Sequence, residues 1–238
     1  MKLSIIIPVF NEEKTIARVL KKLSTVELPG VEKEIIVVND GSTDDTAVKI
    51  KNQQSQMQNL KIINHPKNMG KGAAVITGIK QATGDYLLIQ DADLEYDPHY
   101  LKTLIAPIKK QEAEVVYGTR LKRPPHLRKE EKKPLFLLHY FGNRFLSFLA
   151  SILYGQWITD METGYKIFPK KAVEGMNLQA RGFDFEPEIT AKLLKRGYRI
   201  LEIPITTTPR GYKEGKKLNA LRDGTLALWT LLKYRFVN

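Results

Sequence analysis

Residues 35–46 read IIVVNDGSTDDT, a run of four β-branched residues that ends in a polar turn. Residues 5–13, IIIPVFNEE, and residues 86–93, YLLIQDAD, have the same form, an apolar run followed directly by acidic and amide side chains. Apolar runs of this length, bounded by turn residues, are typical of strands buried on both faces. The three units therefore predict a parallel sheet with polar groups gathered at the carboxyl ends of its strands.

Helix-like segments alternate with these runs. In residues 12–23 the apolar side chains stand at positions 16, 19, 20 and 23, which is the spacing of one helix face. Ser42 or Thr43 is placed to cap a further helix that begins near Asp44. The alternation predicts an α/β fold in which a mostly parallel central sheet carries helices on both faces. The expected strands cover residues 3–9, 34–38, 60–64, 86–90, 115–117, 167–168 and 200–205, and the other expected helices cover 70–81, 98–109, 135–154, 185–196 and 218–234.

Composition and charge narrow the function classes. The 238 residues include no cysteine, which excludes disulfides, thiolate metal sites and cysteine nucleophiles. The 38 Lys and Arg against 26 Asp and Glu give a net charge of +12, which favours phosphorylated substrates, an anionic membrane or nucleic acid as partners. We expect no nucleic acid, because the basic residues are dispersed and no helix-turn-helix, zinc-finger or RNP motif occurs. We also expect a cytoplasmic protein, because no apolar run reaches the length of a membrane span.

The acidic turn Asp91-Ala92-Asp93 follows an apolar strand directly. Two carboxylates two residues apart repel each other unless a counter-ion is present, and a divalent cation such as Mg²⁺ or Mn²⁺ is a suitable one. Glu95 continues the alternate spacing and is a candidate third oxygen ligand. The alternative is a solvated acidic loop.

Each of the other polar turns allows a binding and a structural interpretation. Asp40 can accept hydrogen bonds from a base or a ribose, or it can cap the next helix. Asn11 and Glu13 can bind a nucleoside or stabilise the start of a helix. The turn 68–72, NMGKG, lacks the P-loop spacing, so it is either a phosphate-binding turn or a close-packed helix start.

The segments IIIPVFNEE, VVNDGSTDDT, NMGKGAA and DADLEYDP, in this order, resemble family 2 glycosyltransferases of the GT-A fold. The later segments YGTR, TGYK, GFDFEPE and IPI resemble the dolichyl-phosphate mannose synthase and polyprenyl-phosphate glucosyltransferase branch. The resemblance implies a metal-dependent, inverting transfer of mannose or glucose from a nucleotide-sugar, GDP-mannose or UDP-glucose. It implies polyprenyl or dolichyl phosphate as the acceptor and Mg²⁺ or Mn²⁺ as the cofactor.

The resemblance also implies residue roles and a domain division. Arg120 would face the acceptor phosphate, with Arg210 and Lys217 supplied by a C-terminal loop that closes over the phosphates. We expect a GT-A domain over 1–210, and a loop and amphipathic helix over 211–238 that packs on it or on a membrane. The donor nucleotide site would comprise Pro8, Asn11, Glu13, Asp40, Lys71, Asp91 and Ala92, the metal site Asp91, Asp93 and Glu95, and Asp93 would also be catalytic.

The nature of the acceptor and the class of the reaction each allow an alternative. If the acceptor is a sugar hydroxyl in a polysaccharide or glycolipid, a general base is required, and Asp160 and Glu186 are the first candidates, before Asp184 and Glu188. These four carboxylates can also be purely structural. A nucleotidyltransferase is a further alternative, although the usual glycine-rich basic signature is missing near the N-terminus.

Membrane contact is also expected. The run 120–133 carries seven Lys or Arg, and the apolar segment 135–154 follows it. Cations attract anionic headgroups, and Phe136, Leu138, Phe141, Phe145 and Phe148 can enter the interface. The alternative is that these apolar side chains pack in the core and the basic run is solvated.

Overall fold

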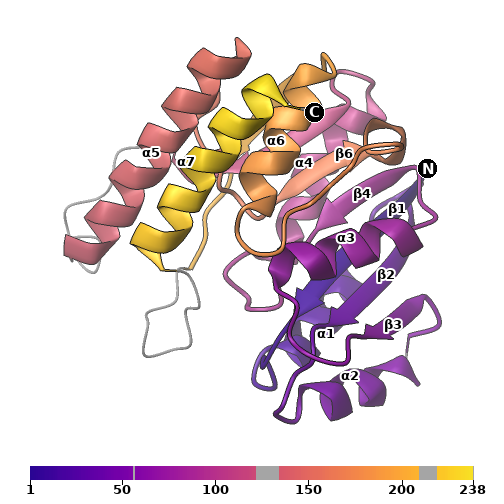
Figure 1. The fold of residues 1–238 in the computed structure, drawn as a ribbon. Coiled ribbons are helices and arrows are strands. Elements are labelled where there is room, and N and C mark those ends of the chain that lie inside the picture. The colour runs from indigo at the N-terminus through magenta and orange to yellow at the C-terminus, as the bar shows by residue number, and fades with distance from the viewer. Residues whose placement is uncertain (56, 122–133, 209–218, 238) are drawn as a thin grey trace.

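The computed structural model describes residues 1–55, 57–121, 134–208 and 219–237 (Figure 1). Strands and helices alternate along most of this part of the chain, as the sequence predicts. The strands are β1 Lys2–Val9, β2 Glu32–Asn39, β3 Leu60–Asn64, β4 Tyr86–Ile89, β5 Val115–Thr119, β6 Lys166–Pro169 and β7 Ile200–Pro204. The helices are α1 Ile16–Thr25, α2 Thr46–Gln54, α3 Lys71–Gln81, η1 Pro98–Tyr100, α4 Leu101–Lys109, α5 Pro134–Tyr154, η3 Lys170–Ala172, α6 Phe185–Lys195 and α7 Ala220–Phe236.

The strands form one sheet in the order β3-β2-β1-β4-β6-β5-β7. Neighbouring strands are parallel except where β6 pairs with β4 and β5, and both of those pairings are antiparallel. Ile89, the last residue of β4, therefore lies opposite Lys166, the first residue of β6. The segment that leads into β6 thus lies at the same sheet edge as the turns that leave β1, β2 and β4. The predicted α/β fold with a mostly parallel sheet is confirmed.

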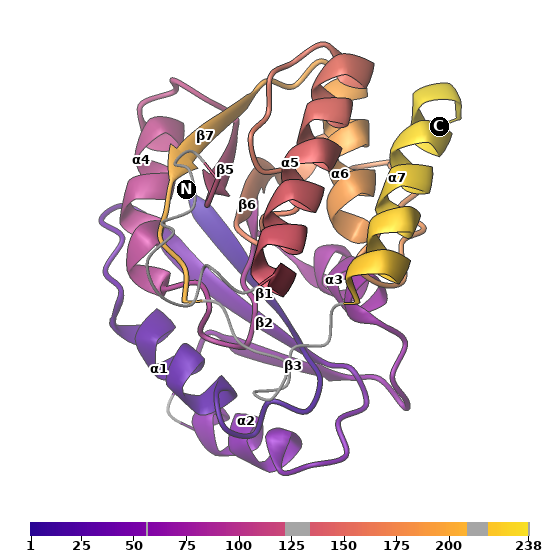
Figure 2. The same cartoon turned by 90° about the vertical axis from the view of Figure 1, so that its left-hand side faces the viewer.

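Helices cover both faces of the sheet (Figure 2). The cores explain this arrangement, because successive strand residues point to opposite faces. Ile5 and Ile7 of β1 pack in the core beneath α1 and α4, whereas Ile6 packs in the core beneath α3, α5, α6 and α7. Buried apolar side chains on both faces account for the continuous apolar runs in the sequence.

Helix starts are where the structure departs from prediction. α1 begins at Ile16, four residues later than expected, and its N-cap residue is Thr15 rather than Asn11. α2 begins at Thr46 with Asp45 as N-cap residue, so neither Ser42 nor Thr43 caps it. The reason is that the polar side chains of these turns bond across from one turn to another instead of to the following helix.

The C-terminal helix α7 lies against α5 and α6 (Figure 1). Its residues Ala227 and Leu231 are buried in the core beneath α3, α5 and α6. The Tyr154 hydroxyl at the end of α5 donates to the Leu231 carbonyl at 2.7 Å. Within the described residues, no helix combines the length and apolarity needed to cross a membrane.

Candidate active site

The turns that follow β1 and β2 are joined by hydrogen bonds between their side chains and backbones. The side-chain amide oxygen of Asn11 accepts from the Thr43 backbone N–H at 2.8 Å, and Asn11 itself has a positive φ of 50°. One Glu13 carboxylate oxygen accepts from the Asp45 N–H at 3.1 Å. Pro8 lies beside Val38 in the neighbouring strand. The structure therefore brings Asn11 and Glu13 against the second turn, whereas Pro8 lies within β1 beside β2, and neither Asn11 nor Glu13 caps α1.

Asp40 is buried, and its carboxylate holds the turn before α3. Its two oxygens accept from the backbone N–H groups of Met69 at 2.9 Å and Gly70 at 2.8 Å. His65, which the sequence analysis did not select, places Nδ1 2.7 Å from Asp40 and Nε2 3.0 Å from the Thr77 hydroxyl. These bonds fix the position of the residue that opens α3, which is Lys71.

The start of α3 is closely packed against the segment 180–182. A Cβ atom on Gly70, whose φ is 99°, would lie 2.1 Å from the Arg181 carbonyl oxygen, so a larger residue does not fit. The Ala73 N–H donates to the same carbonyl at 3.2 Å. Of the two interpretations of the turn 68–72, the close-packed helix start is the one that the structure favours, and the Lys71 side chain is what this turn presents to the site.

Lys71 bridges two carboxylates from distant parts of the chain. Its Nζ lies 2.8 Å from Asp91 and 2.9 Å from Glu186. Burial alone would lower the pKa of Lys71, but the two carboxylates raise it well above its ordinary value. Lys71 is therefore a fixed positive charge that links α3, the turn after β4 and α6.

The acidic turn after β4 is tightly folded. Leu94 has a positive φ of 63°, and the Glu95 N–H donates to an Asp93 carboxylate oxygen at 3.0 Å. Gly164, just before β6, lies so close that a Cβ atom there would be 2.4 Å from the Asp91 carboxylate. Ala92 is buried in the core. The turn keeps Asp91, Asp93 and Glu95 half-exposed at the sheet edge.

The donor set of this turn suits a hard divalent cation, because carboxylate oxygens are the preferred protein ligands of Mg²⁺ and Mn²⁺. Within the described residues, no group of three or more His, Asp or Glu is placed to hold a metal ion. A metal at this turn would therefore use one or two carboxylates together with oxygens of a bound substrate, which is the usual arrangement for Mg²⁺ at phosphate sites.

Arg120, at the end of β5, is held rigidly by Asp160. Nε and Nη2 of Arg120 donate to the two Asp160 oxygens at 2.7 Å each, and the Arg120 backbone N–H donates at 2.9 Å. Burial would lower the pKa of Arg120, but Asp160 raises it well above its usual range. Asp160 is fully buried, and Glu202 accepts from its backbone N–H. With both oxygens bonded to Arg120, Asp160 is better placed to orient that guanidinium than to accept a proton from a substrate.

The acidic side chains at the start of α6 differ in whether their oxygens are already bonded within the protein. Glu188 is fully buried, accepts from the backbone of Gln179 and Ala180, and pairs with Lys192 at 2.8 Å. Asp184 accepts from the Gly182 N–H at 2.7 Å. Glu186 is also buried, but its Oε2 has no hydrogen-bond partner among the described residues. Glu186 is thus the acidic residue of α6 with an oxygen left for a ligand.

Glu162 is, after His65, a second residue of this site that no sequence pattern indicates. Its Oε1 is likewise buried without a hydrogen-bond partner in the described part of the chain. Burial and the nearby Glu186 raise the pKa of Glu162 to about 8. The signal in the sequence is weak, because Glu162 lies between Asp160 and the segment TGYK but matches no spacing rule of its own.

The predicted phosphate ligands Arg210 and Lys217 lie outside the described residues. The described chain reaches Thr208, whose N–H donates to the Glu95 carbonyl at 3.1 Å, and Thr207 forms a bridge with Tyr96. The last described residue before Arg210, Thr208, therefore lies beside the acidic turn.

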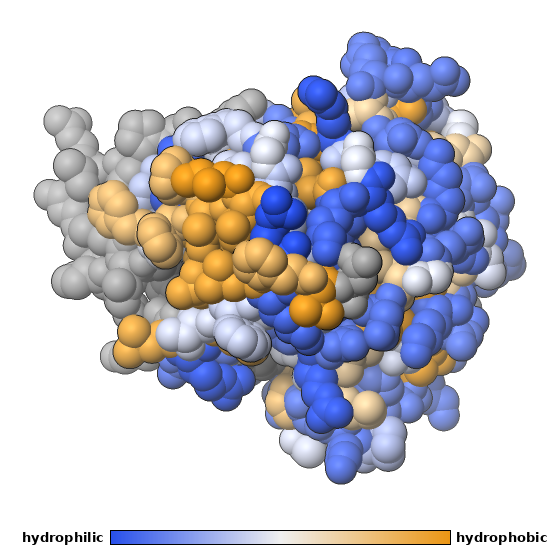
Figure 3. Space-filling view, turned by 45° about the horizontal axis from the view of Figure 1, so that its top comes forward, coloured by the Kyte–Doolittle hydropathy of each residue, from blue (hydrophilic) through white to orange (hydrophobic). Residues whose placement is uncertain are grey.

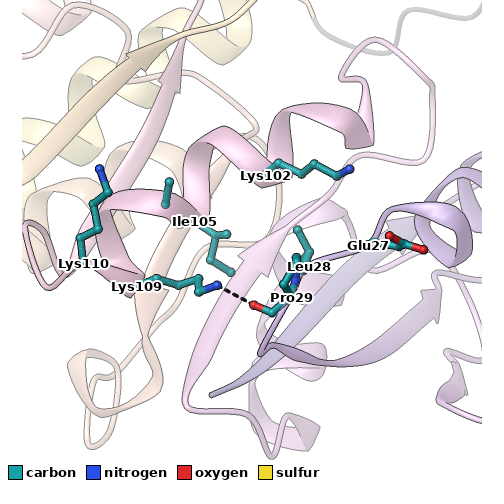
Figure 4. A pocket seen from close by; sticks show the side chains of 8 residues that line it. Glu27, Leu28, Pro29, Lys102, Ile105, Lys109 and Lys110 are labelled. Carbon is teal, nitrogen blue, oxygen red and sulfur yellow. Dashed lines mark hydrogen bonds between the residues drawn. The ribbon is translucent and has the colours of Figure 1, made fainter.

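A separate groove of about 360 Å³ lies between α4 and the connection from α1 to β2 (Figure 4). It lies near the amino ends of β2 and β5, away from the polar turns. Its walls are formed by Glu27, Leu28, Pro29, Lys102, Ile105, Ala106, Lys109 and Lys110. None of the predicted site residues lines it, so the candidate active site is the sheet edge described above.

Residues 4–176 match the family model described as glycosyl transferase family 2. A UDP-N-acetylglucosamine–dolichyl-phosphate N-acetylglucosaminyltransferase of Methanococcus voltae is 32% identical over 234 residues, 91% of this chain and 90% of the relative. A dolichol-phosphate mannosyltransferase of Pyrococcus furiosus is 32% identical over 222 residues, 91% of this chain but 59% of the relative, so the chain spans little more than half of that protein. The solved structure of Mycobacterium tuberculosis glucosyl-3-phosphoglycerate synthase with Mn²⁺, UDP and glucosyl-3-phosphoglycerate has a similar fold, with a TM-score of 0.74 at 19% identity over 100% of this chain and 81% of that one.

Proposed function

The chain belongs to glycosyl transferase family 2 and is a glycosyltransferase, and we propose that it moves a hexose from a nucleotide-sugar to a polyprenyl phosphate, with inversion at the anomeric carbon. The observation that carries this proposal is the pair of fixed cations at the acidic turn. Lys71 contacts Asp91 at one end, and Arg120 lies over the Tyr96 ring, 5.9 Å from its centre, at the other. Two anionic groups, a donor diphosphate and an acceptor phosphate, match two such cations.

The donor half of the reaction rests on the acidic turn and its surroundings. We propose that one or two carboxylates of the set Asp91, Asp93 and Glu95, Asp93 among them, hold Mg²⁺ or Mn²⁺ together with oxygens of the diphosphate. The metal, when bound, would stabilise the negative charge of the leaving nucleoside diphosphate. Lys71 adds a permanent positive charge beside the turn. The nucleoside would lie over the joined turns of β1 and β2, which carry the remaining donor-site residues Pro8, Asn11, Glu13 and Asp40. The Mn²⁺ and UDP complex of the M. tuberculosis enzyme of similar fold supports this assignment.

The acceptor half rests on Arg120. Its guanidinium is preset by Asp160, so little side-chain entropy is lost when it binds a phosphate. A lipid phosphate is already an anionic nucleophile and needs orientation rather than deprotonation. Arg210 and Lys217 would add charge from the segment that begins beside Glu95. Both relatives described above act on dolichyl phosphate by name, which supports a polyprenyl acceptor. A sugar hydroxyl acceptor would instead need a base, and Glu186 is the candidate with an available oxygen.

Calorimetric titration of the purified protein tests the proposed donor site. We expect either GDP and GDP-mannose or UDP and UDP-glucose to bind. We expect this binding to weaken strongly when Mn²⁺ is omitted. A metal requirement is expected because Lys71 alone does not neutralise a diphosphate next to three carboxylates. Absence of binding by all four compounds, with Mn²⁺ and a folded protein, would contradict the proposal.

Membrane contact is the second part of the proposal, and the outer surface of α5 supports it. Phe141, Phe145, Phe148 and Trp157 are 49–64% exposed and line a groove of about 340 Å³ together with Arg144 and Ile158. Figure 3 shows apolar residues gathered on the side of the molecule where α5 and α7 lie. Of the side chains expected at a membrane interface, those of Phe136 and Leu138 lie outside the described side chains. The three phenylalanines named above are exposed, which argues against the alternative that they pack in the core.

An anionic bilayer surface fits this face better than a second copy of the chain. A net charge of +12 repels another copy and attracts anionic lipid. A polyprenyl phosphate acceptor is also located in a bilayer, so the enzyme must approach one. The Arg144 side chain donates to the Leu121 carbonyl, next to Arg120, so the exposed apolar groove lies beside the proposed phosphate ligand.

Replacing Phe141 and Phe145 together by serine is expected to weaken binding to phosphatidylcholine–phosphatidylglycerol vesicles by about tenfold or more, because each ring loses apolar burial at the interface. Co-sedimentation with vesicles measures this. Val48→Ser on α2, which is exposed on the other side of the sheet, is the matched control and should bind as the wild type does. Equal co-sedimentation of the double variant and the wild type would rule out this face.

A further inference from the structure

Two buried carboxylate oxygens of the site have no partner. They are Oε1 of Glu162 and Oε2 of Glu186, and no other buried side-chain oxygen or nitrogen of the described residues is left in this way. Leaving a buried polar atom unsatisfied costs about 1–3 kcal/mol, and nearly all such atoms in folded proteins are paired. Two of them close together at a substrate site therefore indicate that a bound molecule supplies the missing hydrogen bonds.

The backbone on either side of Glu162 is held in place by Lys166. The buried Nζ of Lys166 donates to the Met161 carbonyl at 2.7 Å and to the Thr163 carbonyl at 2.8 Å. It also lies 4.2 Å from the centre of the Tyr117 ring. These contacts occupy the ammonium group with main-chain oxygens, so Lys166 positions Glu162 without using a hydrogen bond to its carboxylate.

The segment 160–164 places Glu162 between the two halves of the site. Asp160, two residues before it, orients Arg120 on the acceptor side. Gly164, two residues after it, abuts Asp91 on the donor side. Glu186 reaches the same region from α6 through its ion pair with Lys71. The two unpaired oxygens thus lie where the group in transfer must be, between the diphosphate and the acceptor phosphate.

We propose that Glu162 and Glu186 bind hydroxyl groups of the hexose in transfer, an inference that rests on the proposed function. Of the parts of the two substrates, the sugar is the one that suits these oxygens. The diphosphate and the acceptor phosphate are anions, which carboxylates repel, whereas a neutral hexose offers several O–H donors. The high proton affinity of Glu162 reduces the charge of the pair near neutral pH, which favours a neutral ligand further.

Replacing Glu162 by methionine, which has a similar length but no oxygen, separates this role from a structural one. For each protein, calorimetry with Mn²⁺ gives the Kd of UDP and of UDP-glucose, or of GDP and GDP-mannose if the guanine nucleotides are the ones that bind. A nucleoside diphosphate carries more negative charge than the nucleotide-sugar, so removal of a carboxylate at position 162 can by itself shift the ratio of the two Kd values. The contribution of the hydrogen bond is therefore isolated by comparing this ratio between Glu162→Met and Glu162→Gln, which remove the same charge. We expect Glu162→Met to shift this ratio against the nucleotide-sugar by about tenfold or more.

Two further proteins complete the experiment. Glu162→Gln keeps the size and a hydrogen-bonding oxygen, so we expect its ratio of Kd values to lie closer to that of the wild type than the ratio of Glu162→Met does. Glu27→Met, in the groove at the other sheet edge, is the control and should leave the ratio unchanged. Thermal melting of Glu162→Met is expected to show no loss of stability, because an unpaired buried oxygen is removed. An unchanged ratio in a folded Glu162→Met protein would overturn the inference, whereas failure of the wild type to bind any of the nucleotides would overturn the proposed function itself.

Discussion

Replacing Asp93 by alanine is expected to reduce kcat by about 10³-fold or more, while the protein keeps its fold. A bound metal contributes several kcal/mol of transition-state stabilisation, and each 1.36 kcal/mol corresponds to a tenfold change in rate. Asp93 is partly exposed and lies in a turn outside the core, where its carboxylate accepts from the Glu95 N–H, so we expect its removal to loosen that turn without unfolding the protein. Turnover with radiolabelled nucleotide-sugar and a polyprenyl phosphate measures the effect, and circular dichroism checks the fold.

Asp85→Ala is the matched control for this variant. Asp85 precedes β4 as Asp93 follows it, and it is exposed at the opposite sheet edge, where its carboxylate accepts from the Lys2 N–H. We expect its activity to stay close to that of the wild type. An Asp93→Ala protein that turns over at the wild-type rate would refute the assignment of this turn as the metal site.

Lys71→Met is expected to have the largest effect on stability. Lys71 is the counter-ion of both Asp91 and Glu186, and Glu186 is almost fully buried. Removing one partner of a buried ion pair typically costs about 3–5 kcal/mol, because a charge stays buried without compensation. Urea unfolding at neutral pH measures this loss. Lys80→Met, exposed near the end of the same helix, is the control, and equal unfolding of the two variants would show that the bridge contributes nothing.

The pH dependence of this loss has a definite sign. In the wild type the pKa of Lys71 is raised above its ordinary 10.5, so its contribution is complete below that value and is lost only as pH rises through the higher folded value. Lys71 itself therefore does not make the free energy of unfolding depend on pH between about pH 5 and 9. The difference in unfolding free energy between the wild type and Lys71→Met should thus shrink only as the pH rises above 10.5.

Much of the fold could be predicted because the signals are local. Apolar runs and helical spacings depend on neighbouring residues, and β3 was expected at 60–64, where it is found. The direction of β6 could not be predicted in this way, because nothing in the four residues KIFP indicates that they run antiparallel to β4 and β5. The predicted start of the first helix, with Asn11 as a possible cap, was wrong because Asn11 forms hydrogen bonds to Thr43, 32 residues away, instead of capping the helix.

The candidate site divides in the same way. Asp91 and Asp93 are visible in the sequence, because an acidic turn after an apolar strand is a local pattern. The partners that give such residues their roles are not local. Lys71 meets Glu186 only once α3 and α6 cover the same face of the sheet, and Glu162 becomes notable only when its oxygen is found buried without a partner. These relations depend on tertiary packing, which no spacing rule describes.

The antiparallel direction of β6 has a consequence for how such an enzyme can diversify. The proposed donor residues up to Glu95 come from the first half of the chain, whereas Arg120, Asp160 and Glu162 come from the stretch between β5 and β6. Because β6 begins at the edge where β4 and β5 end, that stretch enters and exits the site as one continuous insert. The residues proposed to bind the nucleotide therefore precede, in one block, those proposed to bind the acceptor phosphate (Arg120) and the hexose (Glu162). On this proposal, replacement of the second block can change the acceptor or the sugar while the nucleotide ligands stay unchanged.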